Sequence, residues 1–284
     1  MNTSLVRFKA SDGLELQGWL SDLESEAAVI HIHGRSGNGY ENRFLDSVRQ
    51  MYVDNNVSFF AINTRGSGVI ADVYRNGKSE LAGSCYELFE ESVHDISGAV
   101  GYLKDLGKTK FILQGHSFGG AKVVNYVLSV DGIVIDRVIL IAPTDMVGWS
   151  QTDPRSDEYL AKGRELIEGG TPLELVGTQC WLEKVPISAQ AYVTSCEPGS
   201  AVDIYGTIQG ESLLGRVSLP MLIVYGSADA GIKEIDKSMD GWLARVDPIL
   251  NEATQVQVIE GAEHGFKGYE TELSKVVEKF IGEF

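Results

Sequence analysis

Residues 110–130, KFILQGHSFGGAKVVNYVLSV, decide the fold. FILQ is typical of a buried strand, GHSFG at residues 115–119 matches the pattern G-x-S-x-G, and the valines and leucine that follow have helical spacing. A strand that turns directly into a helix holds the serine between them in a strained backbone and lifts its hydroxyl above the sheet. The stretch therefore predicts a nucleophile elbow with Ser117 at its tip.

The pattern alone is weak evidence, because 32 glycines in 284 residues produce it by chance about 0.3 times per chain. The strand before it and the helix after it carry the prediction. They also explain the glycines at positions 115, 119 and 120, because side chains there are expected to collide with the neighbouring strand and helix.

Apolar runs typical of strands recur on both sides of this stretch, with helical periods between them. Such continuous Val, Ile and Leu runs are typical of strands that helices cover on both faces. Alternating strands and helices predict an α/β fold, a doubly wound and mostly parallel sheet with right-handed crossovers. The runs lie at residues 28–32, 57–62, 110–113, 138–141, 221–225 and 256–259. Before them, two runs at residues 6–10 and 14–20 flank Ser11-Asp12-Gly13 and predict an antiparallel hairpin.

One segment, residues 147–219, breaks the alternation and contains four of the seven prolines and two of the four tryptophans. Within it, residues 156–168 have a helical pattern, and residues 186–198 are expected to form a short helix bounded by proline. Insertions of this size over the carboxyl edge of a sheet commonly shape binding sites. We expect a core domain made of residues 1–146 and 220–284, with a helical lid inserted at residues 147–219.

Composition excludes several classes of protein. A net charge of −16 and a pI near 4.7 argue against nucleic-acid binding, which needs clustered Lys and Arg. No signal peptide and no stretch of membrane-span length is recognisable, so we expect a cytoplasmic protein that does not bind membranes. Three cysteines without paired spacing indicate reduced thiols. The sequence does not indicate an oligomeric state.

A serine hydroxyl needs a base within hydrogen-bond reach to attack at neutral pH. His264 lies in the glycine-bounded loop GAEHGF after the last predicted strand, which places it at the same sheet edge as Ser117. His116 adjoins the serine but is expected to point into the packing beneath the elbow, while His94 lies on a predicted helix and His31 within a strand. We therefore expect His264 to be the base.

A third residue should orient the imidazole of that histidine and stabilise its charged form. Asp229, in YGSAD, follows the penultimate predicted strand and so converges on His264. The competitor is Asp145, in APTD, after the strand that ends at Ile141. The order Ser, Asp, His favours Asp229, because this fold generally places the acid after the later strand.

A tetrahedral oxyanion must be stabilised by preorganised backbone amides. The loop HGRSG at residues 33–37 directly follows a predicted strand, and we expect one amide from Arg35 and the other from Phe118. A metal site at His31-x-His33 lacks suitably spaced third and fourth ligands, so we expect neither a metal nor a cofactor.

Together, HGRSG, NTRGSG, GHSFGG, GSAD and GAEHGF resemble the successive signatures of the α/β-hydrolase superfamily, in the expected order over nearly the whole chain. The resemblance implies that fold, with Ser117 as nucleophile, Asp229 as acid, His264 as base, and Arg35 and Phe118 as oxyanion-hole amides. Residues 83–96 and 186–192 are similar to a largely uncharacterised group of bacterial and fungal hydrolases, which implies no particular substrate.

A serine at position 117 disfavours the dehalogenase and epoxide-hydrolase members of the superfamily, which use aspartate there. The oxyanion loop is not HGGG, and Phe118 stands where proline-peptidase relatives usually carry tryptophan. These departures indicate a small carboxylic ester or thioester as the substrate. An amidase, peptidase or acyltransferase with the same triad, and a non-catalytic protein that binds a small molecule, remain as alternatives.

Aromatic residues of the insertion are candidates for contact with a small-molecule acyl substrate, although packing within the lid explains them equally well. They are Trp149, Trp181 and Tyr192. Three arginines, Arg35, Arg65 and Arg75, either bind a substrate carboxylate at the entrance or form structural ion pairs, and the second interpretation is favoured.

Overall fold

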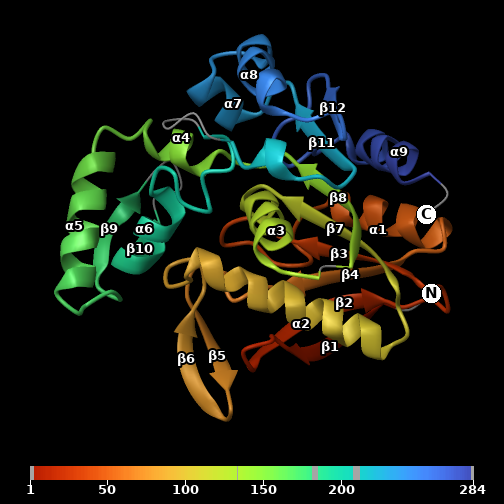
Figure 1. Cartoon of the computed structure of the whole chain (residues 1–284), viewed down its shortest axis with the longest axis horizontal. Helices are drawn as coiled ribbons and strands as arrows, with labels where there is room; N and C mark the ends of the chain where they lie inside the picture. The colour runs from red at the N-terminus through yellow and green to blue at the C-terminus, as the bar shows by residue number, and fades with distance from the viewer. Residues whose placement is uncertain (1–2, 133, 181–184, 207–211, 283–284) are drawn as a thin grey trace.

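The computed structural model describes residues 3–132, 134–180, 185–206 and 212–282. In this part of the chain ten strands form one sheet, ordered β12-β11-β8-β7-β3-β4-β2-β5-β6, with β1 paired to β2 (Figure 1). The strands are β1 (Ser4–Lys9), β2 (Leu14–Ser21), β3 (Ala27–Ile32), β4 (Ser58–Asn63), β5 (Ala71–Arg75), β6 (Lys78–Ala82), β7 (Lys110–His116), β8 (Ile135–Ile141), β11 (Met221–Gly226) and β12 (Thr254–Ile259).

The six strands from β12 to β4 run parallel, whereas β1, β2, β5 and β6 pair antiparallel. Each predicted parallel strand is present, and the opening hairpin is formed by β1 and β2. This arrangement confirms the mostly parallel α/β sheet expected from the sequence.

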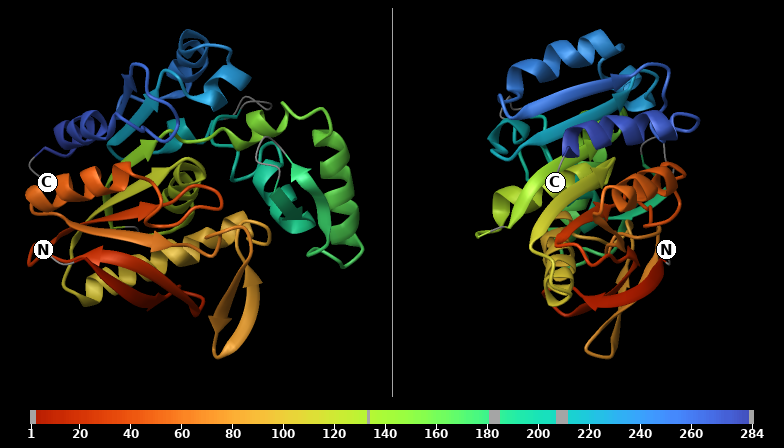
Figure 2. Two further views of the ribbon diagram at one scale, coloured as in Figure 1. Left: turned by 180° about the vertical axis from the view of Figure 1, so that it is seen from behind. Right: turned by 90° about the vertical axis from the view of Figure 1, so that its right-hand side faces the viewer.

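Helices cover both faces of the sheet, which is why its central strands are buried along their whole length. On one face α1 (Phe44–Asp54) packs against α9 (Glu270–Ile281), and on the other α2 (Ser92–Asp105) packs against α3 (Phe118–Ser129) (Figure 2). Beyond β11 lie α7 (Ala230–Ile235) and α8 (Met239–Val246). Single 3₁₀ turns occupy Phe89–Glu91, Leu214–Arg216 and Asp247–Ile249.

The hairpin of β5 and β6 projects from the body of the molecule and was not expected from the sequence (Figure 1). Its turn is Asn76-Gly77, and both residues have positive φ, 52° and 75°. Asn-Gly is the dipeptide that best fits a two-residue hairpin turn of this kind, so a local signal was present.

The segment predicted to be an insertion, residues 147–219, contains most of α4 (Met146–Ser150) together with α5 (Ser156–Glu168), β9 (Leu175–Cys180), β10 (Val185–Ser188) and α6 (Ala189–Cys196). The helix at residues 156–168 is as predicted. The helix expected at residues 186–198 is wrong at its start, because this stretch first pairs with β9 as β10. The helix begins only after Ser188, whose side chain accepts the Ala191 amide hydrogen as an N-cap. The insertion is therefore a mixture of helices and a two-stranded sheet rather than purely helical.

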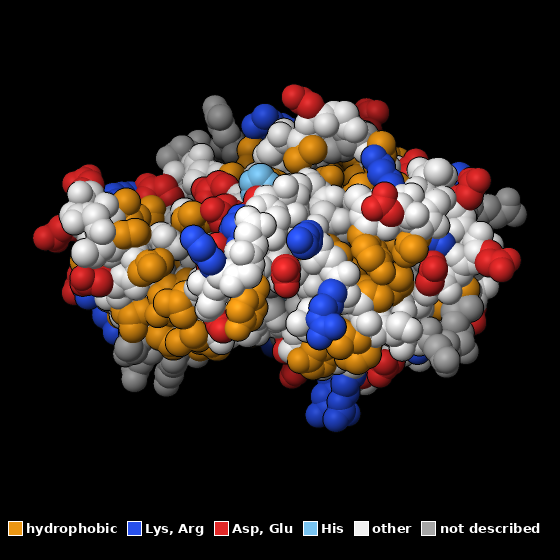
Figure 3. All heavy atoms as spheres, turned by 90° about the horizontal axis from the view of Figure 1, so that it is seen from below, with side chains coloured by type: hydrophobic (Ala, Val, Ile, Leu, Met, Phe, Trp, Pro, Cys, Tyr) orange, Lys and Arg blue, Asp and Glu red, His pale blue; other side chains and the backbone are white. Residues whose placement is uncertain are grey.

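On the face drawn in Figure 3, acidic side chains are scattered, with apolar patches between them. Among the described residues no helix combines the length and the apolar character that crossing a membrane requires. The two cysteines with described side chains, Cys85 and Cys196, are free and buried.

Candidate active site

Ser117 lies between β7 and α3 with φ 55° and ψ −126°, a conformation that residues other than glycine rarely adopt. The strain is held by close packing on both sides. A Cβ added at Gly119 would lie 2.3 Å from the Ile32 carbonyl oxygen, and one at Gly115 would lie 2.4 Å from the Gly119 carbonyl oxygen. The backbone amide of Ser117 also donates to the Ile141 carbonyl at 2.9 Å. Neighbouring backbone thus forces the turn that raises the serine.

His264 and Asp229 meet in the loops that follow β12 and β11. The Nδ1 of His264 lies 2.7 Å from Oδ2 of Asp229. Asp229 is buried, and burial raises its pKa, but the hydrogen bond and charge of His264 and the Gly231 amide lower that pKa below the usual range overall. An ionised Asp229 accepts the Nδ1 hydrogen, so the other imidazole nitrogen, Nε2, is the one available to accept a proton.

Asp145, the competing acid, is engaged elsewhere. Its side chain accepts the Gly148 amide hydrogen at 2.8 Å, which caps α4, and it forms an ion pair with Arg245 at 3.0 Å. The geometry therefore brings Asp229, rather than Asp145, to His264.

The Ser117 hydroxyl contacts a residue that the sequence did not single out. Its Oγ lies 2.9 Å from Oγ1 of Thr144, in the loop after β8. Within the described part of the chain no hydrogen bond joins this hydroxyl to His264. A serine hydroxyl changes partner by rotation about one bond, so the structure shows Ser117 in a resting orientation turned toward Thr144.

His116 supports the His264 loop from beneath, in the packing expected for it. Its Nε2 lies 3.1 Å from the His264 carbonyl oxygen, which can only accept, and its ring packs against Phe44. Burial lowers the pKa of His116 far below the usual range, so the ring is neutral.

The oxyanion-loop candidates also converge on the serine. A Cβ added at Gly34 would lie 3.0 Å from the Ser117 Cβ, which places the Gly34–Arg35 peptide directly beside the elbow. Phe118 is the first residue of α3, so its amide is one of the helix's free N-terminal donors.

A cavity of about 170 Å³ opens beside Thr144, Asp229 and His264, but Ser117, Arg35 and Phe118 are not among the described residues that line it. Its wall is mainly apolar, with Trp149, Tyr225 and Trp242, and it includes Thr144 and His264. Of the predicted aromatic contacts, Trp149 lines the cavity. Tyr192 instead packs on Tyr159 inside the insertion, with ring centroids 5.6 Å apart, and Trp181 lies outside the described residues.

Comparison with protein families gives one match, over residues 77–283, to the family described as "Protein of unknown function (DUF1749)". The chain belongs to this family. A search of curated proteins gave no match.

Solved structures show the same architecture. An esterase from Pyrococcus furiosus is 16% identical, with a TM-score of 0.63 over 99% of this chain and 90% of its own. Est1E from Butyrivibrio proteoclasticus, with ferulic acid bound, is 18% identical, with a TM-score of 0.63 over 97% of this chain and 98% of its own. The α/β hydrolase GrgF from Penicillium sp. sh18 is 16% identical, with a TM-score of 0.64 over 99% and 98%. This DUF1749 member therefore has the α/β-hydrolase fold that its motifs indicated.

In this family member both ring nitrogens of His33 are engaged by neighbouring groups, whereas His31 is engaged through Nδ1 and its buried Nε2 has no hydrogen-bond partner among the described residues. His31 Nδ1 lies 2.9 Å from the Gln114 side-chain nitrogen, whereas His33 contacts the Gly34 carbonyl and Thr64. No cluster of three metal-binding side chains occurs among the described residues.

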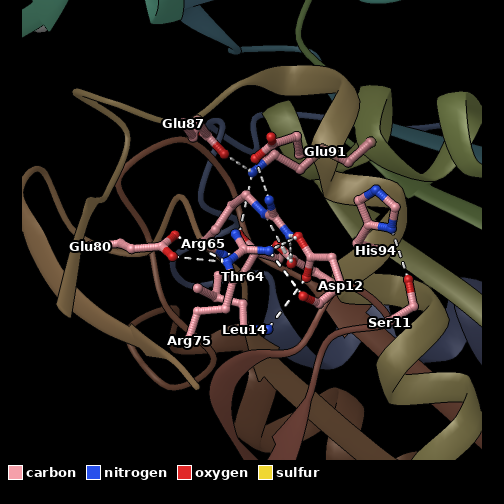
Figure 4. Close-up of polar contacts among 12 residues, drawn as sticks. Ser11, Asp12, Leu14, Thr64, Arg65, Arg75, Glu80, Glu87, Glu91 and His94 are labelled. Atoms are coloured by element: carbon pink, nitrogen blue, oxygen red, sulfur yellow. Dashed lines mark hydrogen bonds and ion pairs between the residues drawn. The ribbon is translucent and has the colours of Figure 1, made fainter. Parts of the chain in front are cut away.

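Two of the arginines form structural ion pairs (Figure 4). Arg65 is almost fully buried, and its guanidinium contacts Asp12 and Asp95 at 2.9 Å and also Glu91. Arg75 reaches Asp12 at 2.8 Å and Glu80 at 3.0 Å. Neither guanidinium lines the cavity beside Thr144 and His264.

Proposed function

We propose that the protein is a serine hydrolase that cleaves a small carboxylic ester or thioester through an acyl-enzyme on Ser117. The observation that carries the proposal is the hydrogen bond between His264 and Asp229 at the sheet edge where the elbow raises the serine. A strained serine, an oriented histidine and a buried carboxylate together form the arrangement that activates a hydroxyl.

In the proposed reaction, Ser117 Oγ attacks the acyl carbonyl carbon while its proton moves to His264 Nε2. The negative charge on the carbonyl oxygen is stabilised by the amides of Arg35 and Phe118. The His264 proton then passes to the leaving oxygen or sulfur as that bond breaks. Water then attacks the acyl carbon while His264 takes one of its protons. The bond between Ser117 Oγ and the acyl carbon breaks, the carboxylic acid leaves, and the proton on His264 returns to Oγ.

Charges around the cavity favour an uncharged acyl group. Its wall carries three aspartates and one arginine, and that arginine, Arg245, is paired with Asp145 at 3.0 Å and with Asp236 at 2.6 Å. A substrate carboxylate would meet excess negative charge there, and the apolar wall would not solvate it. We expect short aliphatic and small aromatic acyl groups to bind, and the ferulic acid bound to Est1E makes a feruloyl ester a useful probe.

We propose that residues 147–219 act as the lid of this cavity. Trp149 of α4 forms part of its wall. Further along, Tyr205 donates to the Pro143 carbonyl at 2.9 Å, in the loop that carries Thr144. The insertion therefore contacts the loop that holds the serine hydroxyl, and it is suited to select the acyl group.

One observation favours the alternative of a small-molecule-binding protein without catalysis: the Ser117 hydroxyl contacts Thr144 instead of His264. An amidase, peptidase or acyltransferase would use the same residues and differ only in the leaving group or the acceptor.

The deciding experiment is labelling of the purified protein with a fluorophosphonate probe, together with a panel of p-nitrophenyl and feruloyl esters. We expect strong labelling that Ser117→Ala abolishes. The matched control is Ser11→Ala, because Ser11 also contacts a histidine, His94 Nδ1 at 2.8 Å, but lies in a turn without an elbow. Absence of labelling in folded wild-type protein would refute the hydrolase proposal and favour the binding alternative.

A further inference from the structure

A lysine and a glutamate are fully buried behind the elbow. Nζ of Lys122, on α3, lies 2.5 Å from Oε2 of Glu87, and the two side chains are 0% and 1% exposed. Removing two charges from water costs several kcal/mol per ion, so a pair of apolar residues would generally serve stability as well. The position of this pair therefore calls for a reason other than stability.

Lys122 contacts Phe118 directly and reaches the oxyanion loop through Thr64. Its Nζ lies 5.1 Å from the centre of the Phe118 ring, and it donates to Thr64 Oγ1 at 3.3 Å. Thr64 in turn contacts His33, the first residue of the oxyanion loop (residues 33–37). Figure 4 shows Thr64 and Glu87, the two residues that bind the lysine Nζ, close to Arg65 and its acidic partners.

The hydrogen bonds of His33 define its tautomer. The backbone amide of Thr64 donates to His33 Nε2 at 3.0 Å, so Nε2 carries no hydrogen. Burial and the charge of Lys122 lower the pKa of His33 to about 3, so the ring is neutral. Nδ1 must then carry the hydrogen, and it donates to the Gly34 carbonyl at 2.7 Å.

Fixing the Gly34 carbonyl also fixes the next amide. In a planar trans peptide the C=O of one residue and the N–H of the next point in opposite directions. Because His33 holds the Gly34 carbonyl, the Arg35 N–H is directed the opposite way and cannot flip without breaking that bond. Gly34 itself lies against Ser117, so a fixed direction of the Arg35 amide is what this amide would need to serve as one of the two oxyanion donors.

We infer that Lys122, neutralised by Glu87, is a positioning residue that keeps the oxyanion hole preformed. It acts through Thr64 and His33 on the Arg35 amide and through the Phe118 ring on the start of α3. The inference rests on the proposed function, because only an acyl-transfer reaction develops the charge that these amides would stabilise.

Two variants break the connection from Lys122 through Thr64 to His33 without leaving a buried charge unpaired. Thr64→Val removes Oγ1 but keeps the Thr64 backbone amide on His33. Lys122→Met combined with Glu87→Gln replaces both charged groups by neutral ones of similar length. The matched control is Lys108→Met, because Lys108 is also buried and paired, with Asp22 at 2.8 Å, but lies away from the cavity.

The readouts are kcat, KM and the affinity for a trifluoromethyl ketone, which forms a tetrahedral adduct with the serine. Loss of one oxyanion donor lowers kcat about 10²–10³-fold. For the double variant we expect kcat to fall about 10- to 100-fold, KM to stay within about 3-fold, and ketone affinity to fall in parallel with kcat/KM. Thr64→Val should lower kcat and ketone affinity by a smaller factor. Thr64→Ser, which keeps the hydroxyl, should retain most of the wild-type kcat and ketone affinity.

Lys108→Met should lower thermal stability while leaving kcat and ketone affinity unchanged. If the double variant and Thr64→Val both fold and keep the wild-type kcat and ketone affinity, the positioning role of Lys122 is refuted, while the proposed hydrolase function stands. A wild-type protein without turnover or labelling would overturn the proposed function and this inference together, so the two failures are distinguishable in one set of assays.

Discussion

Asp229 and Asp145 both follow parallel strands of the sheet, yet only Asp229 contacts His264. We predict that Asp229→Asn lowers kcat about 10⁴-fold, because an amide no longer selects the required histidine tautomer. Asp145→Asn should change kcat only a few-fold but lower the melting temperature, since it weakens the α4 cap and the Arg245 ion pair. Steady-state kinetics and thermal unfolding of both variants test this, and equal losses of kcat would contradict it.

Thr144 holds the serine hydroxyl in its resting orientation. A neutral hydrogen bond of this kind contributes about 1 kcal/mol, which corresponds to a factor of about five in an equilibrium. Thr144→Val should therefore release Ser117 toward His264 and raise the rate of fluorophosphonate labelling a few-fold. Stopped-flow labelling measures that rate. A slower reaction would instead show that the Thr144 hydroxyl assists the attack.

For individual residues, the sequence identified candidates through motifs at the ends of predicted strands. Ser117, Asp229 and His264 could be proposed in this way because parallel strands bring their carboxyl ends to one edge. Thr144 could not, because a threonine in a loop carries no pattern, and its contact depends on how Pro143 and the strained Ala142, with φ 43°, direct the chain.

Among the elements, α2 crosses β1 at a glycine. A Cβ at Gly98 would lie 2.2 Å from the Lys9 carbonyl oxygen, whereas one at Gly101 on the same helix would have no atom within 4 Å. Gly98→Ala should lower the free energy of unfolding by about 1–3 kcal/mol through overpacking. Gly101→Ala should raise it by about 0.5–1 kcal/mol through helix propensity. Urea unfolding tests the pair, and the hypothesis fails if both variants shift stability in the same direction.

Asp12, in the turn of the β1–β2 hairpin, pairs with Arg75 of β5 and with Arg65, which also pairs with Asp95 of α2. Burial raises the pKa of Asp12, but hydrogen bonds from the two arginines lower it to about 2 overall. A carboxylate with a lowered pKa stabilises the fold above its unfolded pKa of about 3.9, and this contribution is lost as the pH falls toward 2.

Asp12→Asn should therefore reduce the free energy of unfolding at pH 7 by about 1–2 kcal/mol, a figure already reduced for partial solvent screening. The difference from the wild type should shrink as the pH falls from about 4 to 2. Denaturant unfolding at a series of pH values measures it, and a difference that stays constant over that range would contradict the assignment.

Elements with a strong periodic pattern were predictable, and elements defined by their partners were not. The strand β7 and the helix α5 have unmistakable patterns. The strand β10 covers Val185–Ser188 and so includes the start of PISAQAY, where local propensity favoured a helix, and only its partner β9 makes it extended. The β5–β6 hairpin has polar strands with little apolar alternation, so its Asn-Gly turn was the only clear local signal.

For the molecule as a whole, we predict that the net negative charge weakens the binding of negatively charged substrates. The chain carries −16, and the cavity wall adds an excess of carboxylates beside Arg245. An ester with an acyl carboxylate should bind more weakly than a neutral ester of equal size, and added salt should narrow the gap because it screens the repulsion. Measuring KM for such a matched pair of esters at low and high salt tests this. Salt-independent KM values for both would contradict it.

The fold class could be predicted because the order of strands and helices along the chain limits a doubly wound sheet to few topologies. The internal structure of the insertion could not, since its helices and strands are stabilised by one another rather than by the alternation of the core. Its role as a lid stays a prediction.

The long segment between β8 and β11 affects how the sheet forms during translation. β8 and β11 are neighbours in the sheet, but the insertion puts about 80 residues between them. At a synthesis rate of about 5–20 residues per second, β8 waits roughly 4–16 s for its partner to be translated. During that time its edge is unpaired on the nascent chain, where a molecular chaperone or early folding of the insertion would protect it from aggregation.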